Sequence, residues 1–317
     1  MTMFDDPKMV ELLEAIVALL VAGTMAGFLL RRLARTAAAR ATGGNILART
    51  GAWWLMVIVF AAAGVLGVGA SAVLFALISF LALREMVTLS PTRRADHHTL
   101  FSVFFIATPV QYALVYIRWY GLFAIFIPVY VFLWVCIRST LTGDYKNYME
   151  RVAKIYFALM ICVYCVSHAP ALLDLKIPAL KDQNVKLLFF LAIVVELSDV
   201  FQYIWGKLLG RRPIAPHISP NKTWEGFIGG TLSAAGAGTL LWWMTPFSPW
   251  QAALMSLLIV LMGFFGGIVM SAVKRDAGIK DYGALIPGHG GIMDRIDSLC
   301  FAAPVFFHLT RYYFTMR

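Results

Sequence analysis

The chain has 317 residues, of which 60 % are hydrophobic and only 14 % are charged, and its mean hydropathy is +0.76. Soluble domains are nearer half apolar and about a quarter charged, so this composition excludes a soluble globular protein. The net charge of +10 is compatible with nucleic-acid binding, but Lys and Arg retained in cytoplasmic loops are its commoner cause in a membrane protein. We therefore expect an integral membrane protein that binds no nucleic acid.

The apolar runs are unbroken and close to 20 residues long, which is the length of a helix that crosses a bilayer. They lack the alternation of apolar and polar residues that marks transmembrane strands. The sequence therefore predicts an all-α polytopic membrane protein with about ten transmembrane helices. The predicted spans are residues 9–30, 53–69, 71–89, 100–117, 120–137, 155–173, 187–205, 227–244 and 250–273, with a last span from Leu299.

Alternate connections between these spans collect the basic residues, which indicates that those connections are cytoplasmic. Arg40 and Arg49 belong to the first of them, an Ala-, Thr- and Gly-rich connection. The connection 174–186 is an exception, because it carries three lysines on the predicted outer side. Under this topology the connections 206–226 and 274–298 both face the cytoplasm, where nucleotides are found.

A single membrane domain is predicted over residues 1–317, because no tandem repeat and no hydrophilic domain separates the spans. Residues 1–186 are expected to be a helical scaffold and residues 187–317 to carry the chemistry. The many glycine and alanine residues of the helices permit close packing, which leaves a homodimer open.

Two acidic residues, Glu196 and Asp199, lie inside the predicted span 187–205. An acidic side chain at the centre of a membrane helix costs about 2.5–3.5 kcal/mol on insertion scales, so such residues are rare and usually functional. Solvation at the cytoplasmic end of the helix would remove most of that cost. Asp199 is closer to this end and is the stronger functional candidate.

The connection 206–226 reads GKLLGRRPIAPHISPNKTWEG and combines positive charge with short hydrogen-bonding side chains before a helix. Helix N-termini favour anions because their free N–H groups point outward. An ordinary basic loop with a Ser or Thr helix cap is the alternative. The phosphate-binding candidates in this connection are Ser219, Asn221, Lys222 and Thr223.

The stretch 271–297 is the most polar part of the second half, with eight charged residues among 27. Its glycines allow the backbone to approach a ligand closely, and His289 lies among them. Acids of this kind hold Mg²⁺ against substrate phosphates, although a salt-bridged loop is the alternative. The phosphate-binding candidates are Lys274, Arg275, Lys280, His289 and Arg295, and the acids are Asp281, Asp294 and Asp297.

Three motifs follow one another between Glu196 and the C-terminus. They are Ser198-Asp199 with Gly206-Lys207, then Ser219-Pro-Asn-Lys222-Thr-Trp-Glu225-Gly, and finally Ser271-Ala-Val-Lys274-Arg275 with Lys280-Asp281, Pro287-Gly-His289-Gly-Gly and Asp294-Arg295-Ile-Asp297. Together they resemble the signature of the CDP-diacylglycerol synthase (phosphatidate cytidylyltransferase) family. With the segment Gln202-Tyr203-Ile-Trp-Gly, the chain resembles a divergent paralogue branch of that family.

The resemblance implies an enzyme of the bacterial cytoplasmic membrane that converts CTP and phosphatidic acid, a membrane lipid, to CDP-diacylglycerol and pyrophosphate. It implies Mg²⁺ or another divalent cation as cofactor and an active site that faces the cytoplasm. The resemblance implies metal or catalytic roles for Asp199, Asp281 and Asp294. It implies phosphate-binding roles for Lys222, Lys274, Arg275, Lys280 and Arg295.

The chain departs from the family pattern just before Ser271. Family members usually have Gly-Asp four residues before this serine and Glu directly before it, whereas this chain has Gly266-Gly267 and Met270. The missing Asp is one that the family uses for metal. The alternative expectation is therefore a catalytically weakened relative that binds lipid or nucleotide as a scaffold.

Overall fold

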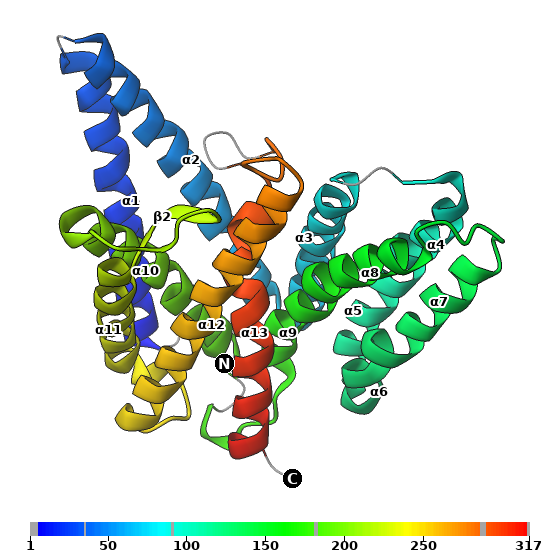
Figure 1. Cartoon of the computed structure of the whole chain (residues 1–317). Helices are drawn as coiled ribbons and strands as arrows, with labels where there is room; N and C mark the ends of the chain where they lie inside the picture. Colours follow the sequence, from blue (N-terminus) through cyan, green and yellow to red (C-terminus); the bar gives the residue numbers. More distant parts are fainter. Residues whose placement is uncertain (1–5, 35, 90–91, 181–182, 286–289, 316–317) are drawn as a thin grey trace.

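The computed structural model describes residues 6–34, 36–89, 92–180, 183–285 and 290–315, which are almost entirely helical. In these ranges eight helical segments are long and apolar enough to cross a membrane, and they include α10 (Val185–Leu209) and α12 (Pro249–Asp276). Two further helices, α11 (Trp224–Leu240) and α13 (Met293–Phe314), run back beside them (Figure 1). The predicted all-α polytopic membrane architecture is confirmed, with eight candidate spans among the described residues where about ten were predicted.

The first two helices, α1 (Pro7–Leu33) and α2 (Ala37–Leu66), form a hairpin that projects from the rest of the molecule (Figure 1). The expected connection before residue 53 was wrong, because α2 begins at Ala37 and carries Arg40 and Arg49. Alanine is the strongest helix former, and this segment is rich in it. One glycine of the expected connection serves packing instead, because a Cβ on Gly43 would lie 2.6 Å from the backbone nitrogen of Arg31 on α1.

The middle of the chain adds α3 and three spans that each contain a π-helical turn. One such turn, Val103–Ala107, precedes Pro109, and another, Phe126–Val131, contains Pro128. Proline lacks a backbone N–H and disturbs the regular helical ladder, which accounts for an irregular turn at both places. The elements are α3 (Val68–Thr88), α4 (His97–Ser102), α5 (Thr108–Tyr116), α6 (Tyr120–Ile125), α7 (Phe132–Thr140), α8 (Tyr148–Leu159) and α9 (Val166–Ala171).

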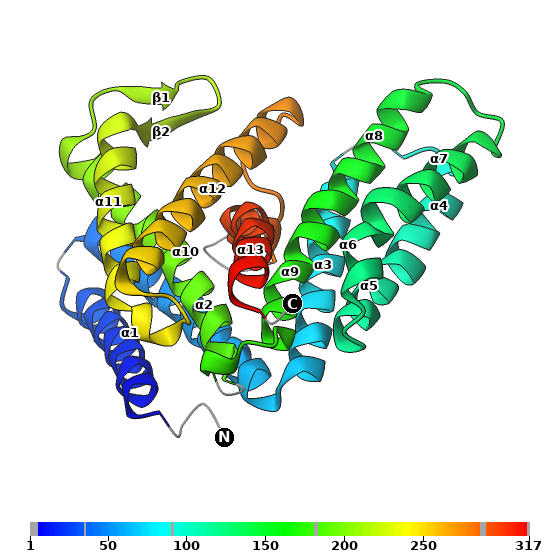
Figure 2. The same cartoon turned by 90° about the horizontal axis from the view of Figure 1, so that it is seen from below.

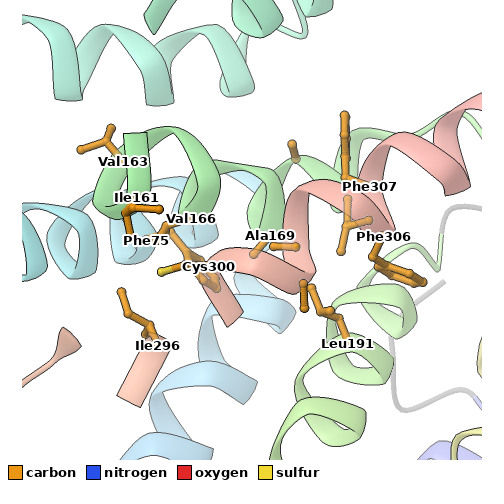
Figure 3. Packing of buried hydrophobic residues seen from close by; sticks show 14 of the residues in the cluster. Phe75, Ile161, Val163, Val166, Ala169, Leu191, Ile296, Cys300, Phe306 and Phe307 are labelled. Carbon is orange, nitrogen blue, oxygen red and sulfur yellow. The ribbon is translucent and has the colours of Figure 1, made fainter. Parts of the chain in front are cut away.

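The apolar core holds α13 against α3, α9 and α10 (Figure 3). Phe75 of α3, Val166 of α9, Leu191 of α10 and Phe306 of α13 are all buried there. Between membrane helices such a contact is held by van der Waals packing rather than by removal of apolar surface from water, and it fixes the position of α13. The charged residues in the first turns of α13 are thereby held at a defined place.

The connection between α10 and α11, expected to be a loop, contains a short antiparallel β-hairpin. β1 (Pro213–Ala215) pairs with β2 (Ser219–Thr223), and the hairpin lies beyond α11 near the end of α12 (Figure 2). Arg275 at the end of α12 donates from Nε to the carbonyl oxygen of Ile218 at 3.2 Å. The two polar segments that the sequence placed on the same side of the membrane therefore touch.

Lys186 belongs to the connection with three lysines on the predicted outer side. It lies in the first turn of α10, where its buried ammonium forms an ion pair with Asp6, the N-cap residue of α1. The same ammonium lies 5.9 Å from the ring centroid of Trp243. One of the three positive charges that opposed the predicted orientation is therefore neutralised within the protein.

Candidate active site

Four elements meet at Gly267 of α12. A Cβ on this glycine would lie 2.7 Å from Lys222 Nζ on β2, 3.8 Å from Ser298 Oγ and 3.9 Å from Asp297 Oδ2 on α13. Ser298 Oγ lies 3.3 Å from Asp199 Oδ2 on α10 and 3.4 Å from Asp297 Oδ1. We call these five residues the Gly267 cluster. It brings together two acids and one lysine that are up to 98 positions apart in the sequence.

Lys222 has few partners for its ammonium group within this cluster. Its Nζ lies 3.5 Å from the carbonyl oxygen of Phe264 and 4.7 Å from the centroid of the Phe264 ring. Burial lowers the pKa of Lys222, while the charges of Asp199 and Asp297 act in the opposite direction. A lysine ammonium has three donors, so most of its hydrogen-bonding capacity is left for a ligand.

Arg295 in the first turn of α13 also has spare donor capacity. Its Nε is buried and has no hydrogen-bond partner among the described residues. Its charge acts on Glu196 and Asp199 of α10, so the guanidinium lies near the acids of the predicted site. An unpartnered buried donor costs about 1–3 kcal/mol, which a bound phosphate oxygen would offset.

Asp294 is engaged by the protein on both carboxylate oxygens. Oδ1 accepts a hydrogen bond from Lys274 Nζ at 2.9 Å, and Oδ2 accepts from the backbone N–H groups of Tyr282 and Gly291, both at 2.9 Å. The side chains of Asp294 and Lys274 are 5 % and 13 % exposed. In this geometry Asp294 closes the loop between α12 and α13 and orients Lys274.

The other predicted residues of this loop that the structure describes are more exposed to solvent than Asp294 and Lys274. Asp281 and Lys280 are both exposed. Arg275 is also exposed, and its Nη1 donates to the carbonyl oxygen of Ile279 at 3.0 Å in addition to the bond to Ile218. The predicted phosphate ligand His289 lies outside the described residues.

Backbone N–H groups at the start of α11 are hydrogen-bonded within the protein itself. Thr223 is the N-cap residue, and its hydroxyl oxygen accepts from Gly226 N at 3.2 Å. Trp224 N donates to the carbonyl oxygen of Arg212 at 2.9 Å. The helix cap proposed from the sequence is therefore confirmed at Thr223. Phosphate binding by Ser219, Asn221 and Thr223 stays a prediction, and Asn221 is exposed.

The fit of this site to a divalent cation depends on how many carboxylates lie together. Among the described residues, no three His, Cys, Asp or Glu side chains are gathered closely enough to hold a metal, so the predicted acids Asp199, Asp281 and Asp294 do not form one such group. Asp199 and Asp297 do lie together beside Ser298 Oγ. Mg²⁺ commonly takes one or two carboxylates and completes its shell with water and substrate phosphates, so this pair fits the ion.

Sequence reasoning missed two residues of this region. Ser298 has no distinctive motif beyond its position after Asp297. Glu85 of α3 accepts hydrogen bonds from the backbone N–H groups at the start of α13, although it belongs to the half of the chain predicted to be scaffold. An acid in the last turn of a helix opposes the helix dipole, and that was the available signal.

Comparison with known proteins gives a consistent result. Residues 47–313 match the model of the cytidylyltransferase family. The uncharacterized protein YnbB of Escherichia coli K12 is 40 % identical over 302 residues, which are 95 % of this chain and 97 % of that protein.

Two proteins named phosphatidate cytidylyltransferase match over a shorter region. The one from Mycobacterium leprae is 49 % identical over 37 % of this chain and 38 % of its own length. The one from Staphylococcus haemolyticus is 37 % identical over 40 % of this chain and 50 % of its own length. The match thus spans half or less of these two relatives, whereas the family model covers most of the chain. The chain belongs to the cytidylyltransferase family, on the branch that includes YnbB.

Proposed function

We propose that the protein transfers a cytidylyl group from CTP to phosphatidic acid and forms CDP-diacylglycerol and pyrophosphate in phospholipid biosynthesis. The Gly267 cluster carries this proposal, because it sets two acids and a lysine with spare donors next to Arg295. Family membership and the names of two relatives support the substrate pair. The site lies in a bacterial cytoplasmic membrane and faces the cytoplasm under this proposal.

The reaction forms one P–O bond and breaks another. An oxygen of the lipid phosphate bonds to the α-phosphorus of CTP, and the bond from the α-phosphorus to the bridging oxygen of the β-phosphate breaks, so that pyrophosphate leaves. No covalent intermediate with the protein is needed. The protein has to position two anionic substrates and offset their charge.

The residues divide into acids and phosphate ligands. Asp199 and Asp297 would hold Mg²⁺, which neutralises negative charge on the attacking and leaving oxygens when it is bound. Asp281 keeps its predicted role as a further acid at the open side, and Asp294 acts by orienting Lys274. The phosphate ligands are Lys222, Lys274, Arg275, Lys280 and Arg295.

A second candidate function is a weakened relative that binds nucleotide or lipid without efficient transfer. The observation that favours it is the environment of Gly267. A side chain at this position would point at Lys222 Nζ and Asp297, so an aspartate there would join the acids of the site. Without it, the site has one carboxylate fewer than the family pattern.

The test compares the native chain with Gly267→Asp, both purified in lipid nanodiscs. Labelled CTP, phosphatidic acid and Mg²⁺ are supplied, CDP-lipid is measured, and Mn²⁺ binding is titrated in parallel. Gly44→Asp is the matched control, because a Cβ on Gly44 has nothing within 4 Å. We expect CDP-lipid from the native chain and tighter Mn²⁺ binding by Gly267→Asp alone.

Other outcomes separate the two functions. Product from Gly267→Asp but not from the native chain would establish the weakened relative. No product from either variant, with both folded, would exclude the transferase. Replacement of Lys222 by methionine in the Gly267→Asp background would show whether the new carboxylate acts through the ammonium, because the built Cβ lies 2.7 Å from Lys222 Nζ.

A further inference from the structure

We propose that Glu85 of α3 is a positioning residue that holds the start of α13, and with it Arg295 and Asp297, in the geometry needed for cytidylyl transfer. This inference rests on the proposed function. It assigns a role in the reaction to the half of the chain that the sequence indicated to be scaffold.

The contact is made by both oxygens of the carboxylate. Oε1 accepts from Ile292 N at 3.0 Å, and Oε2 accepts from Met293 N at 2.9 Å. Ile292 is the N-cap residue of α13 and Met293 its first residue, so Glu85 satisfies two of the N–H groups that a helix start leaves free. More than 200 residues separate the partners in the sequence, since the bond to Ile292 spans 207 positions.

Two glycines before α13 lie directly against this carboxylate. A Cβ on Gly291 would lie 2.4 Å from Oε2, and a Cβ on Gly283 would lie 2.9 Å from Oε1. Real Cβ atoms essentially never come this close, so a side chain at either position would make the Glu85 carboxylate shift from its place at the helix start. Two glycines of the polar stretch are thereby explained by packing against Glu85.

Electrostatics favours the same role. Glu85 lies in the last turn of α3, where the helix dipole is negative and an acid is unfavourable. The start of α13 supplies partial positive charge instead, worth up to about 2 kcal/mol in a partly buried setting. Glu85 has no basic partner among the described ion pairs, so this interaction is what offsets its position.

The consequence concerns the first turns of α13. Asp294, Arg295 and Asp297 lie within five residues of Met293, so a shift of the helix start moves all of them relative to Asp199 on α10. A misplacement on the order of 1 Å can lower a rate about 100-fold. Glu85 therefore acts on turnover through the position of α13, without touching the substrate.

The experiment uses the full chain in nanodiscs with the variants Glu85→Gln and Gly291→Ala. Glu85→Gln keeps the shape of the side chain but removes one acceptor and the charge. Gly291→Ala keeps the charge but places a methyl group against Oε2. Glu150→Gln is the matched control, because Glu150 is exposed and bonds only to Lys154 on its own helix.

Three quantities are measured for each variant: turnover per folded protein with CTP, phosphatidic acid and Mg²⁺, KM for CTP, and hydrogen–deuterium exchange of peptides that cover residues 290–298. We expect both variants to lower kcat by about 10- to 100-fold, as supporting residues of metal sites do. KM for CTP should change little. Exchange at 290–298 should become faster in both variants and stay unchanged in Glu150→Gln.

Two results would overturn the proposal: native kcat together with native exchange in Glu85→Gln and Gly291→Ala, or a loss of activity that disappears once folded protein is counted. If the native chain forms no CDP-lipid, the proposed function fails first. Exchange then decides alone whether Glu85 holds α13, and unchanged exchange in both variants would refute that. The two failures are thus distinguishable.

Discussion

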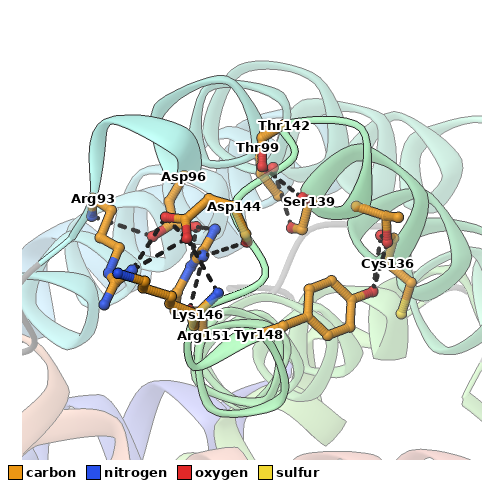
Figure 4. Close-up of polar contacts among 11 residues, drawn as sticks. Arg93, Asp96, Thr99, Cys136, Ser139, Thr142, Asp144, Lys146, Tyr148 and Arg151 are labelled. Atoms are coloured by element: carbon orange, nitrogen blue, oxygen red, sulfur yellow. Dashed lines mark hydrogen bonds and ion pairs between the residues drawn. The ribbon is translucent and has the colours of Figure 1, made fainter.

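Two clusters of charged residues are built from similar side chains and differ in their ion pairs. The first, which we call the Arg151 cluster, joins Arg93, Asp96, Asp144 and Arg151 near the ends of α7 and α8 (Figure 4). The second is the Gly267 cluster. In the Arg151 cluster every charged side chain has an ionic partner, whereas the Gly267 cluster lacks a direct salt bridge among its described residues.

Arg151 shows a charge that is paired directly with carboxylates, since its Nη2 lies 2.7 Å from Asp96 Oδ1 and its Nη1 lies 3.2 Å from Asp144 Oδ2. Its Nε donates to Asp96 Oδ1 at 2.8 Å, and its Nη1 donates to the carbonyl oxygens of Asp144 and Lys146 at 2.8 and 3.1 Å. Lys222, in contrast, has one long bond to a carbonyl oxygen. The comparison teaches that residue type alone does not mark a site: the lack of a direct ion pair among its described residues distinguishes the Gly267 cluster, whose charges are left for a ligand.

The largest expected effect tests the Gly267 cluster. Asp297→Asn should lower cytidylyl transfer on the order of 100-fold or more, because it removes charge that would hold the metal where negative charge develops. Thermal stability should not fall, since the change also removes a repulsion between Asp297 and Asp199. Activity assays with Mg²⁺ titration and thermal unfolding in nanodiscs measure both.

Asp276→Asn is the control for this change, because Asp276 is exposed at the end of α12. Equal turnover in Asp297→Asn and Asp276→Asn would contradict the assignment of Asp297. If Asp297→Asn loses activity only because less protein is folded, so that turnover per folded protein stays native, then Asp297 has a structural role like the residues of the Arg151 cluster.

The next effect tests the Arg151 cluster. Arg151→Met should destabilise the protein by about 3 kcal/mol, because it leaves Asp96 without its partner, and removal of one member of a buried ion pair is strongly destabilising. The side chains of Arg151 and Asp96 are only 10 % and 4 % exposed. Chemical unfolding in nanodiscs gives the free energy, and turnover per folded protein should stay native.

Arg93→Met is the matched control within the same cluster. Arg93 is 41 % exposed and bonds to Asp144 at 3.2 Å, so its loss should cost less than about 1 kcal/mol. Similar destabilisation by the two variants would show that burial does not separate them. A specific loss of turnover in Arg151→Met would overturn the structural role of the cluster.

The smallest effect concerns Thr223. This residue follows Lys222 in the sequence, but its hydroxyl oxygen already accepts a hydrogen bond from Gly226 N. Thr223→Ala removes the cap of α11 and should cost about 1 kcal/mol of stability. Thr223→Ser keeps the hydroxyl and should stay near native. A KM for CTP raised only by the alanine variant would show that the hydroxyl also binds phosphate, and a native KM in both variants would show that it acts as a helix cap alone.

Much of the fold followed from the sequence because membrane spans have a simple physical signature. Unbroken apolar runs of about 20 residues predicted the all-α architecture and most helix positions. The start of α2 was missed, since Ala-, Thr- and Gly-rich sequence suits both a connection and a helix that packs closely on another. The β-hairpin was missed because Pro213–Ala215 and Ser219–Thr223 are short and have no alternating pattern.

The roles of the site residues stay predictions, and the structure shows where these residues lie. The motifs drew attention to Asp199, Lys222 and Asp297, which the structure brings together, and to Gly267, which lies at their centre. They also assigned Asp294 to the metal, although both of its oxygens are bonded within the protein. A carboxylate has the same appearance in a sequence whether its partner is a lysine, a backbone amide or a metal ion.

The sequence by itself determined that the chain is a helical membrane protein and drew attention to two polar segments as the candidate site, because hydropathy and glycine-rich charged motifs are local properties. Only the tertiary structure decided which charges form direct ion pairs and which do not. It also showed that Glu85 reaches the start of α13 across 207 positions. Hydrogen bonds and close approaches depend on distances between segments far apart in the chain, and no local pattern records these distances.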